Sequence, residues 1–103
     1  MKYQIQEKQL TISLPKKMDG RNIEKIIKKI EHLVKKRNIT CIFLDFKHTC
    51  FFDISGIKII MCCHRILHPL GGKVEAVNLS AEIKKILIMS GVTKIIQIKE
   101  DGK

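Results

Sequence analysis

Residues 40–46, Thr-Cys-Ile-Phe-Leu-Asp-Phe, are a near-continuous run of residues that favour strands. Such a run is typical of a strand that is covered on both faces, at the centre of a partly parallel sheet. After a loop over residues 47–53, a helical pattern extends from about Ser55 to Leu67 and is apolar on almost every side. That helix is either deeply buried or carries an exposed apolar side. A buried strand that leads into a helix favours an α/β fold.

Toward the N-terminus, the pattern predicts two strands and one helix. Residues 10–14 alternate between apolar and polar side chains, which indicates a half-buried strand, and residues 3–6 are a candidate partner strand. From Asn22 to Arg37, apolar residues recur every three or four positions with lysines on the opposite side, which predicts an amphipathic helix. Either Asp19 or Asn22 is suited to cap its start.

Toward the C-terminus, a turn at residues 69–72 precedes an alternating strand over residues 73–79. Ser80 is suited to cap a third helix that extends to about Met89, and Gly91 stands where a helix C-cap glycine belongs. Residues 94–98 form a last short strand. The whole order predicts a mixed central sheet of four to five strands with about three helices packed on it, in one domain over residues 1–103.

Length and composition argue for one small domain and against a secreted or membrane-spanning protein. With 103 residues, 45% hydrophobic and 29% charged, the chain is suited to fold as one small domain. The first ten residues are polar and do not form a signal peptide, so we expect the four cysteines to be reduced and the protein to be cytoplasmic. No apolar run approaches the roughly 18 residues of a membrane span, so no membrane insertion is expected.

The net charge of +10 draws attention to anionic partners such as nucleic acid, acidic proteins or a membrane surface. Proteins that bind nucleic acid rely on arginine and stacked aromatic residues, whereas this chain has three arginines, four phenylalanines, one tyrosine and no tryptophan. Lysine therefore serves first as a solvated surface residue. A basic binder of nucleic acid or anionic surfaces stays open as a further alternative, although nucleic acid is not the expected partner.

Side chains that could carry chemistry do not form a recognisable site. Zinc sites use four converging ligands, usually from paired short motifs, and the chain has no CxxC pair. We therefore expect no metal and no cofactor, and the absence of nucleophile or phosphate-loop motifs indicates neither an enzyme nor a small-molecule substrate. The metal candidates considered are His48, Cys50, Cys62, Cys63, His64 and His68.

One loop remains of interest, Phe51-Phe-Asp-Ile-Ser-Gly56, which leads into the second helix. Backbone N–H groups at a helix start favour anions, so the loop is a candidate functional site. The simpler interpretation is that Asp53 or Ser55 caps the helix.

The ordered motifs resemble the STAS domain family, and in particular its small stand-alone anti-sigma factor antagonists. The resemblance covers nearly the whole chain. Its family pattern is an apolar strand, a short loop, Asp-Ser-Ser-Gly or Asp-Ser-Thr-Gly at a helix start, a Gly-Gly turn, and Met-Ser-Gly before a last strand. The matching segments here are residues 41–46, 53–56, 71–72 and 89–91, and Met18-Asp19 matches the residues before the first helix.

The resemblance implies a non-enzymatic regulator that binds an anti-sigma factor or a related serine kinase. In the family the kinase phosphorylates the serine after the aspartate, and the complex then dissociates. That position is Ile54 here, so the usual phosphoacceptor serine is replaced; Ser55 is an alternative phosphorylation site, or a cap. The implied partner-binding residues are Asp19, Asp53, Ile54, Ser55, Gly56 and Ile57.

Two further expectations come with the resemblance. The C-terminal helix that usually follows the last strand in the family is missing here, and the surface that this leaves uncovered could serve a homodimer or another partner. The alternative function within the fold is a structural STAS subunit of a larger assembly, such as a lipid-transport ATPase complex or a stressosome.

Overall fold

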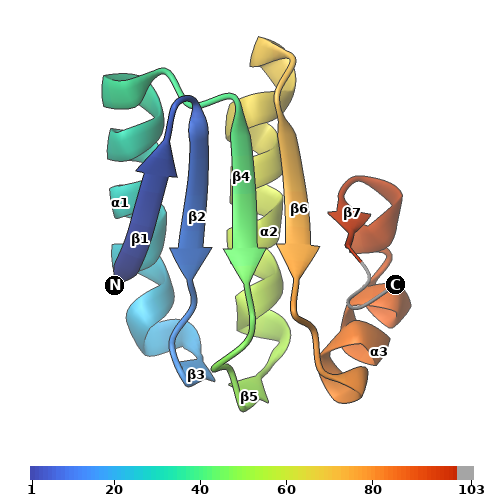
Figure 1. Cartoon of the computed structure of the whole chain (residues 1–103). Helices are drawn as coiled ribbons and strands as arrows, with labels where there is room; N and C mark the ends of the chain where they lie inside the picture. The colour runs from blue at the N-terminus through green and yellow to red at the C-terminus, as the bar shows by residue number, and fades with distance from the viewer. Residues whose placement is uncertain (100–103) are drawn as a thin grey trace.

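The computed structural model describes residues 1–99, which fold around one mixed sheet of five strands. The strands lie in the order β1 (Lys2–Gln6), β2 (Gln9–Ser13), β4 (Cys41–Asp45), β6 (Lys73–Val77) and β7 (Gln97–Ile98). β1 pairs with β2 in antiparallel fashion and all other neighbours are parallel. The predicted α/β class and the central place of the strand at residues 40–46 are confirmed (Figure 1).

Two helices lie side by side behind the sheet, α1 (Gly20–Arg37) and α2 (Ile54–Leu67) (Figure 1). Both were predicted from their apolar periodicity, and both begin slightly earlier than the sequence suggested. The apolar residues of β2, β4 and β6 that face these helices are almost completely buried. They form two rows across the sheet, Leu10–Ile42–Val74 and Ile12–Leu44–Ala76.

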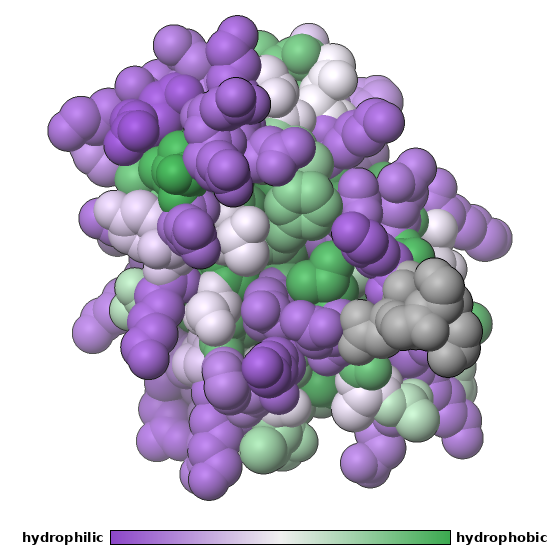
Figure 2. Space-filling model, viewed as in Figure 1, coloured by the Kyte–Doolittle hydropathy of each residue, from purple (hydrophilic) through white to green (hydrophobic). Residues whose placement is uncertain are grey.

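The prediction that the central strand is covered on both faces was wrong. Along β4, buried residues alternate with partly exposed ones, and Cys41, Phe43 and Asp45 point to the side away from α1 and α2. Among residues 1–99, no helix lies over the middle of that face (Figure 1). Figure 2 shows hydrophobic residues in the middle of this face with hydrophilic residues around them. Residues 40–46 were misinterpreted because Cys41 and Phe43 are apolar although they lie on the uncovered face.

The C-terminal part follows the predicted order with different boundaries. Ser80 caps α3 (Ala81–Ser90), and Gly91 ends this helix in the left-handed conformation, both as predicted. Residues 94–98 are not one strand, because a short 3-10 helix, η2 (Val92–Lys94), precedes β7. The expectation that no helix follows the last strand concerns residues 100–103, which lie outside the described residues.

A second, very short sheet was not predicted. It pairs β3 (Lys17–Met18) with β5 (Phe51–Phe52) in parallel, below the carboxyl ends of the main strands (Figure 1). Two-residue strands leave no periodicity in a sequence. This small sheet matters because each of its strands leads directly into a helix.

Candidate functional site

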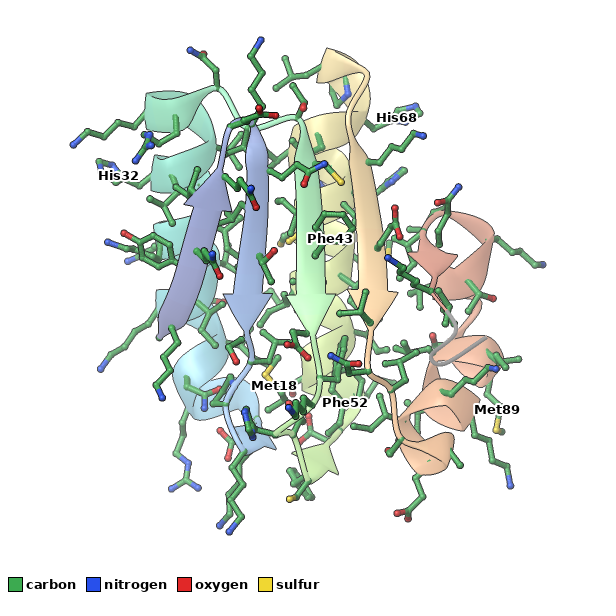
Figure 3. All side chains as sticks on the ribbon, in the orientation of Figure 1. Met18, His32, Phe43, Phe52, His68 and Met89 are labelled. Carbon is green, nitrogen blue, oxygen red and sulfur yellow. The ribbon has the colours of Figure 1, made fainter. Side chains whose placement is uncertain are left out.

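The two long helices begin at the same corner of the molecule. The small sheet pairs Met18 with Phe52, and the next residue on each strand is the aspartate that caps the following helix. Figure 3 shows Met18 and Phe52 close together at this lower end of the sheet. The pairing therefore holds Asp19 and Asp53 at corresponding positions, and it brings the predicted site residues from both segments together.

Asp19 and Asp53 both act as helix caps. An Asp19 carboxylate oxygen accepts a hydrogen bond from the Arg21 backbone N–H at 3.0 Å, and Asp53 accepts one from the Ser55 N–H at 2.8 Å. The hydrogen bond from the Arg21 backbone is the main reason that the pKa of Asp19 is lowered. Of the capping alternatives, Asp19 rather than Asn22 caps α1, and Asp53 rather than Ser55 caps α2.

Ile54 and Ser55 are adjacent but lie in different surroundings. The Ile54 side chain is 82% exposed, whereas Ser55 is half-buried. A Cβ added at Gly20 would lie 3.9 Å from the Ser55 hydroxyl oxygen, so this hydroxyl faces the first turn of α1. Of these two residues, Ile54 is the one whose side chain the corner presents to solvent.

Gly56 is buried and allows the corner to close. A Cβ at this position would lie 2.5 Å from the nearest atom of the Phe52 ring, which is closer than carbon atoms can approach. The Phe52 ring in turn packs edge-on against Phe46 with 5.5 Å between the ring centroids. The missing side chain at Gly56 therefore leaves room for the Phe52 ring, and Gly56 itself is buried inside the corner and not exposed to a partner.

Apolar residues on both sides of Ile54 in the sequence are also exposed. Phe51 is 49% exposed and Met61 is 40% exposed, and Ile57 is partly buried against the core. Residues 54, 57 and 61 share one side of α2 because three and four positions make a turn of helix. We call Phe51, Ile54, Ile57 and Met61 the α2 patch. Phe51 lies in the loop that the sequence marks as a candidate site, although it is not among the implied partner-binding residues. Met61 is not among them either, and its helical spacing from Ile54 was the available signal.

An ion pair links α2 to α1 near the patch. The Lys58 ammonium donates a hydrogen bond to a Glu24 carboxylate oxygen at 2.8 Å. This contact lowers the pKa of Glu24 and raises the pKa of Lys58. Because both side chains are well exposed, the pair contributes little to stability, but it supplies a polar neighbour to the α2 patch.

The remaining chemistry-bearing side chains do not gather into a site. His64 and His68 stack on each other with 4.9 Å between ring centroids, yet no group of three His, Cys, Asp or Glu within residues 1–99 is placed to hold a metal ion. Burial raises the pKa of the Cys63 thiol to about 12, which keeps it protonated. Within the same residues, no helix has the length and apolarity needed to cross a membrane.

Comparisons with known proteins identify the family and the fold. The family model of the STAS domain matches residues 1–102. The anti-sigma F factor antagonist of Paenibacillus polymyxa is 23% identical over 92 residues, which cover 89% of this chain and 79% of the relative. The structure of the anti-sigma factor antagonist SpoIIAA in its unphosphorylated form matches with a TM-score of 0.85 at 22% identity, over 97% of this chain and 88% of that one. The phosphorylated form of SpoIIAA, described as a Bacillus cell fate determinant, matches with a TM-score of 0.77 at 22% identity, over 97% and 91% of the two chains.

Proposed function

The chain belongs to the STAS domain family, and we propose that it is a non-enzymatic regulator that binds an anti-sigma factor through the α2 patch. The distant relationship to an anti-sigma F factor antagonist, together with the fold shared with SpoIIAA, supports this class of function. The protein would act in the cytoplasm as one domain, by competing with the sigma factor for its inhibitor.

The exposed side chain of Ile54 is the observation that carries the proposal. It lies directly after the cap of α2 and is 82% exposed. The resemblance of the motif over residues 53–56 implies that this is the position of the family's phosphorylated serine. An isoleucine this exposed gains little from folding, whereas complete burial of its side chain against a partner is worth about 1.5–3 kcal/mol before the costs of association. Phe51 and Met61 add apolar area beside it.

Binding of this kind would not be switched off by phosphorylation. A kinase transfers the γ-phosphoryl group of ATP to a hydroxyl oxygen, and Ile54 has no hydroxyl. The neighbouring hydroxyl of Ser55 faces Gly20 and the start of α1. We therefore expect a constitutive binder, in which an apolar contact stands where other members introduce a charge of about −1.5 to −2.

A phosphorylation assay tests this function. An anti-sigma factor that is itself a serine kinase, cloned from the organism that encodes this protein, is mixed with the protein and ATP. Complex formation is measured by gel filtration, and phosphopeptides by mass spectrometry. A genome that encodes no such kinase would overturn the kinase as the partner. The wild type should stay bound without phosphate, as should Ser55→Ala, whereas Ile54→Ser should be phosphorylated and released. Phosphate on Ser55 with loss of the complex would overturn constitutive binding, and no complex with the wild type would overturn the function itself.

A second apolar surface favours the alternative of a structural subunit. Ile88, Met89 and Ile95, on α3 and just after η2, are 54%, 77% and 37% exposed, and Met89 points away from the sheet (Figure 3). If the protein belongs to a larger assembly, these residues should be buried there. Native mass spectrometry of the protein purified from its own organism separates a large defined assembly from a one-to-one complex.

A further inference from the structure

A groove with a basic rim lies beside the corner, between the first two strands and the start of α1. It has a volume of about 760 Å³ and is open to solvent. Its apolar lining comes from exposed Met1 and Tyr3, half-buried Pro15, and the buried residues Leu14 and Ile26. Exposed basic side chains surround this lining, namely Lys2, Lys16, Lys25, Lys29 and His48.

The positive charges of the groove are not neutralised within the described chain. The ion pairs Arg21–Asp19 and Lys58–Glu24 use no lysine of the groove. No aspartate or glutamate lines the groove. Like charges that gather without counter-charges create a positive potential, which attracts an anionic group and speeds its encounter.

The groove and the α2 patch are joined through the backbone. The Lys16 carbonyl oxygen accepts hydrogen bonds from the N–H groups of Cys50 at 2.8 Å and of Phe51 at 3.1 Å. Lys16 lines the groove, and Phe51 belongs to the α2 patch. A protein seated on the patch can therefore extend a segment into the groove without crossing a large distance.

We propose that the groove receives an acidic segment of the protein that binds the α2 patch, an inference that rests on the proposed function. Lysine suits carboxylates without fixing their geometry, and the apolar lining suits the side chain of an interspersed hydrophobic residue. The only tyrosine of the chain, Tyr3, has the Lys29 ammonium over its ring, 5.5 Å from the centroid, so that face of the ring is not open for stacking a nucleic-acid base. These features favour an acidic peptide segment over a nucleic acid.

A peptide titration tests the groove without the partner. A short glutamate-rich peptide with one central leucine is added to the ¹⁵N-labelled protein, and amide shifts are followed by NMR. The shifts should concentrate on Ser13, Lys16, Asn22, Ile26 and His48, and they should weaken with added salt. Shifts that spread equally to the lysines at the end of α1, or an oligonucleotide of equal charge that displaces the peptide, would overturn the proposal.

A matched pair of variants tests the groove with the partner. Lys25→Gln with Lys29→Gln removes two charges from the groove, and Lys35→Gln with Lys36→Gln removes two from the far end of the same helix. The first pair should weaken anti-sigma factor binding by about three- to tenfold at low salt, mainly through the association rate, and the second pair by less than about twofold. Equal effects of the two pairs would overturn the proposed binding of an acidic segment in the groove, without contradicting anti-sigma factor binding at the α2 patch. If the wild type binds no anti-sigma factor, the proposed function fails, and the peptide titration alone decides the groove.

Discussion

The helices α1 and α2 lie side by side on the same face of the sheet, yet they use their apolar residues differently. Every apolar residue of α1 is buried, and its outer side consists mostly of lysines and other polar residues. α2 also buries one side, but Ile54 stays largely in solvent and Met61 stays partly exposed. Both helices begin at an aspartate cap held by the small sheet of β3 and β5, so the difference lies in their side chains and not in their setting.

The contrast separates residues that hold the fold from residues that are free to act on a partner. An apolar side chain on α1 has its full contact with the core. An exposed isoleucine on α2 has no such role, which makes its position a candidate for binding. Substitutions on the two helices test that separation.

The largest effect on stability is expected at Ile30, which is 1% exposed on the inner side of α1. Ile30→Ala should lower the free energy of unfolding by about 2–5 kcal/mol, because it leaves a cavity in the core. Ile54→Ala, the matched change on α2, should lower it by less than about 0.5 kcal/mol. Urea denaturation measures both; similar losses would contradict the assignment of Ile54 to a surface without a folding role.

Gly56→Ala should destabilise the protein by about 1–3 kcal/mol, because the added methyl group meets the Phe52 ring at 2.5 Å. Gly20→Ala is the matched control, since its methyl group would lie 3.9 Å from the Ser55 hydroxyl oxygen and causes no clash. Thermal denaturation compares the two. A neutral or stabilising Gly56→Ala would show that the ring moves aside at little cost.

Removing the cap of α2 should have a smaller effect. Asp53→Ala loses the hydrogen bond from the Ser55 N–H and should cost about 1 kcal/mol. Asp53→Asn keeps an acceptor oxygen and should lose little stability. Hydrogen exchange of the first turn of α2 should rise in the alanine variant alone. An equal rise of exchange in both variants would mean that the carboxylate charge, not the hydrogen bond, stabilises the first turn of α2.

The ion pair between the helices should give the smallest effect, visible in a pH titration. The hydrogen bond from Lys58 is the main cause that lowers the pKa of Glu24 below 4.5, so its small stabilisation is present above that pH and is lost as the pH falls through the lowered value. The raised pKa of Lys58 places the opposite limit above 10.5. In Lys58→Met, NMR titration should show the pKa of Glu24 return toward 4.5; an unchanged value would place the ion pair in the structure but not in solution.

Much of the fold follows from residues whose pattern is local. The six buried apolar residues of α1 recur at helical spacing, and Ser80 and Gly91 mark the ends of α3 by their own conformational preferences. The small sheet of β3 and β5 could not be predicted, because its four residues carry no period and its hydrogen bonds join segments far apart in the sequence. The uncovered face of β4 was missed because Phe43 is apolar on a partly exposed side.

The candidate site divides in the same way. The motif over residues 53–56 marks the start of α2, and the cap by Asp53 follows from its residue type. The inward direction of the Ser55 hydroxyl depends on the neighbouring turn at Gly20, which only the packing of α1 against α2 creates. Likewise, the groove at Lys16 and Lys25 forms only when the strand ends and α1 come together.

The affinity of the anti-sigma factor for Ile54→Asp, measured by calorimetry, tests the central claim that α2 presents a partner surface. Ile88→Asp on α3 is the matched control, since Ile88 is also an exposed helical isoleucine, at 54%. We predict that Ile54→Asp weakens binding at least about 30-fold, because a buried charge without a partner costs on the order of 2 kcal/mol or more, while Ile88→Asp binds like the wild type. Unchanged binding by Ile54→Asp, or an equal loss in both variants, would contradict the claim.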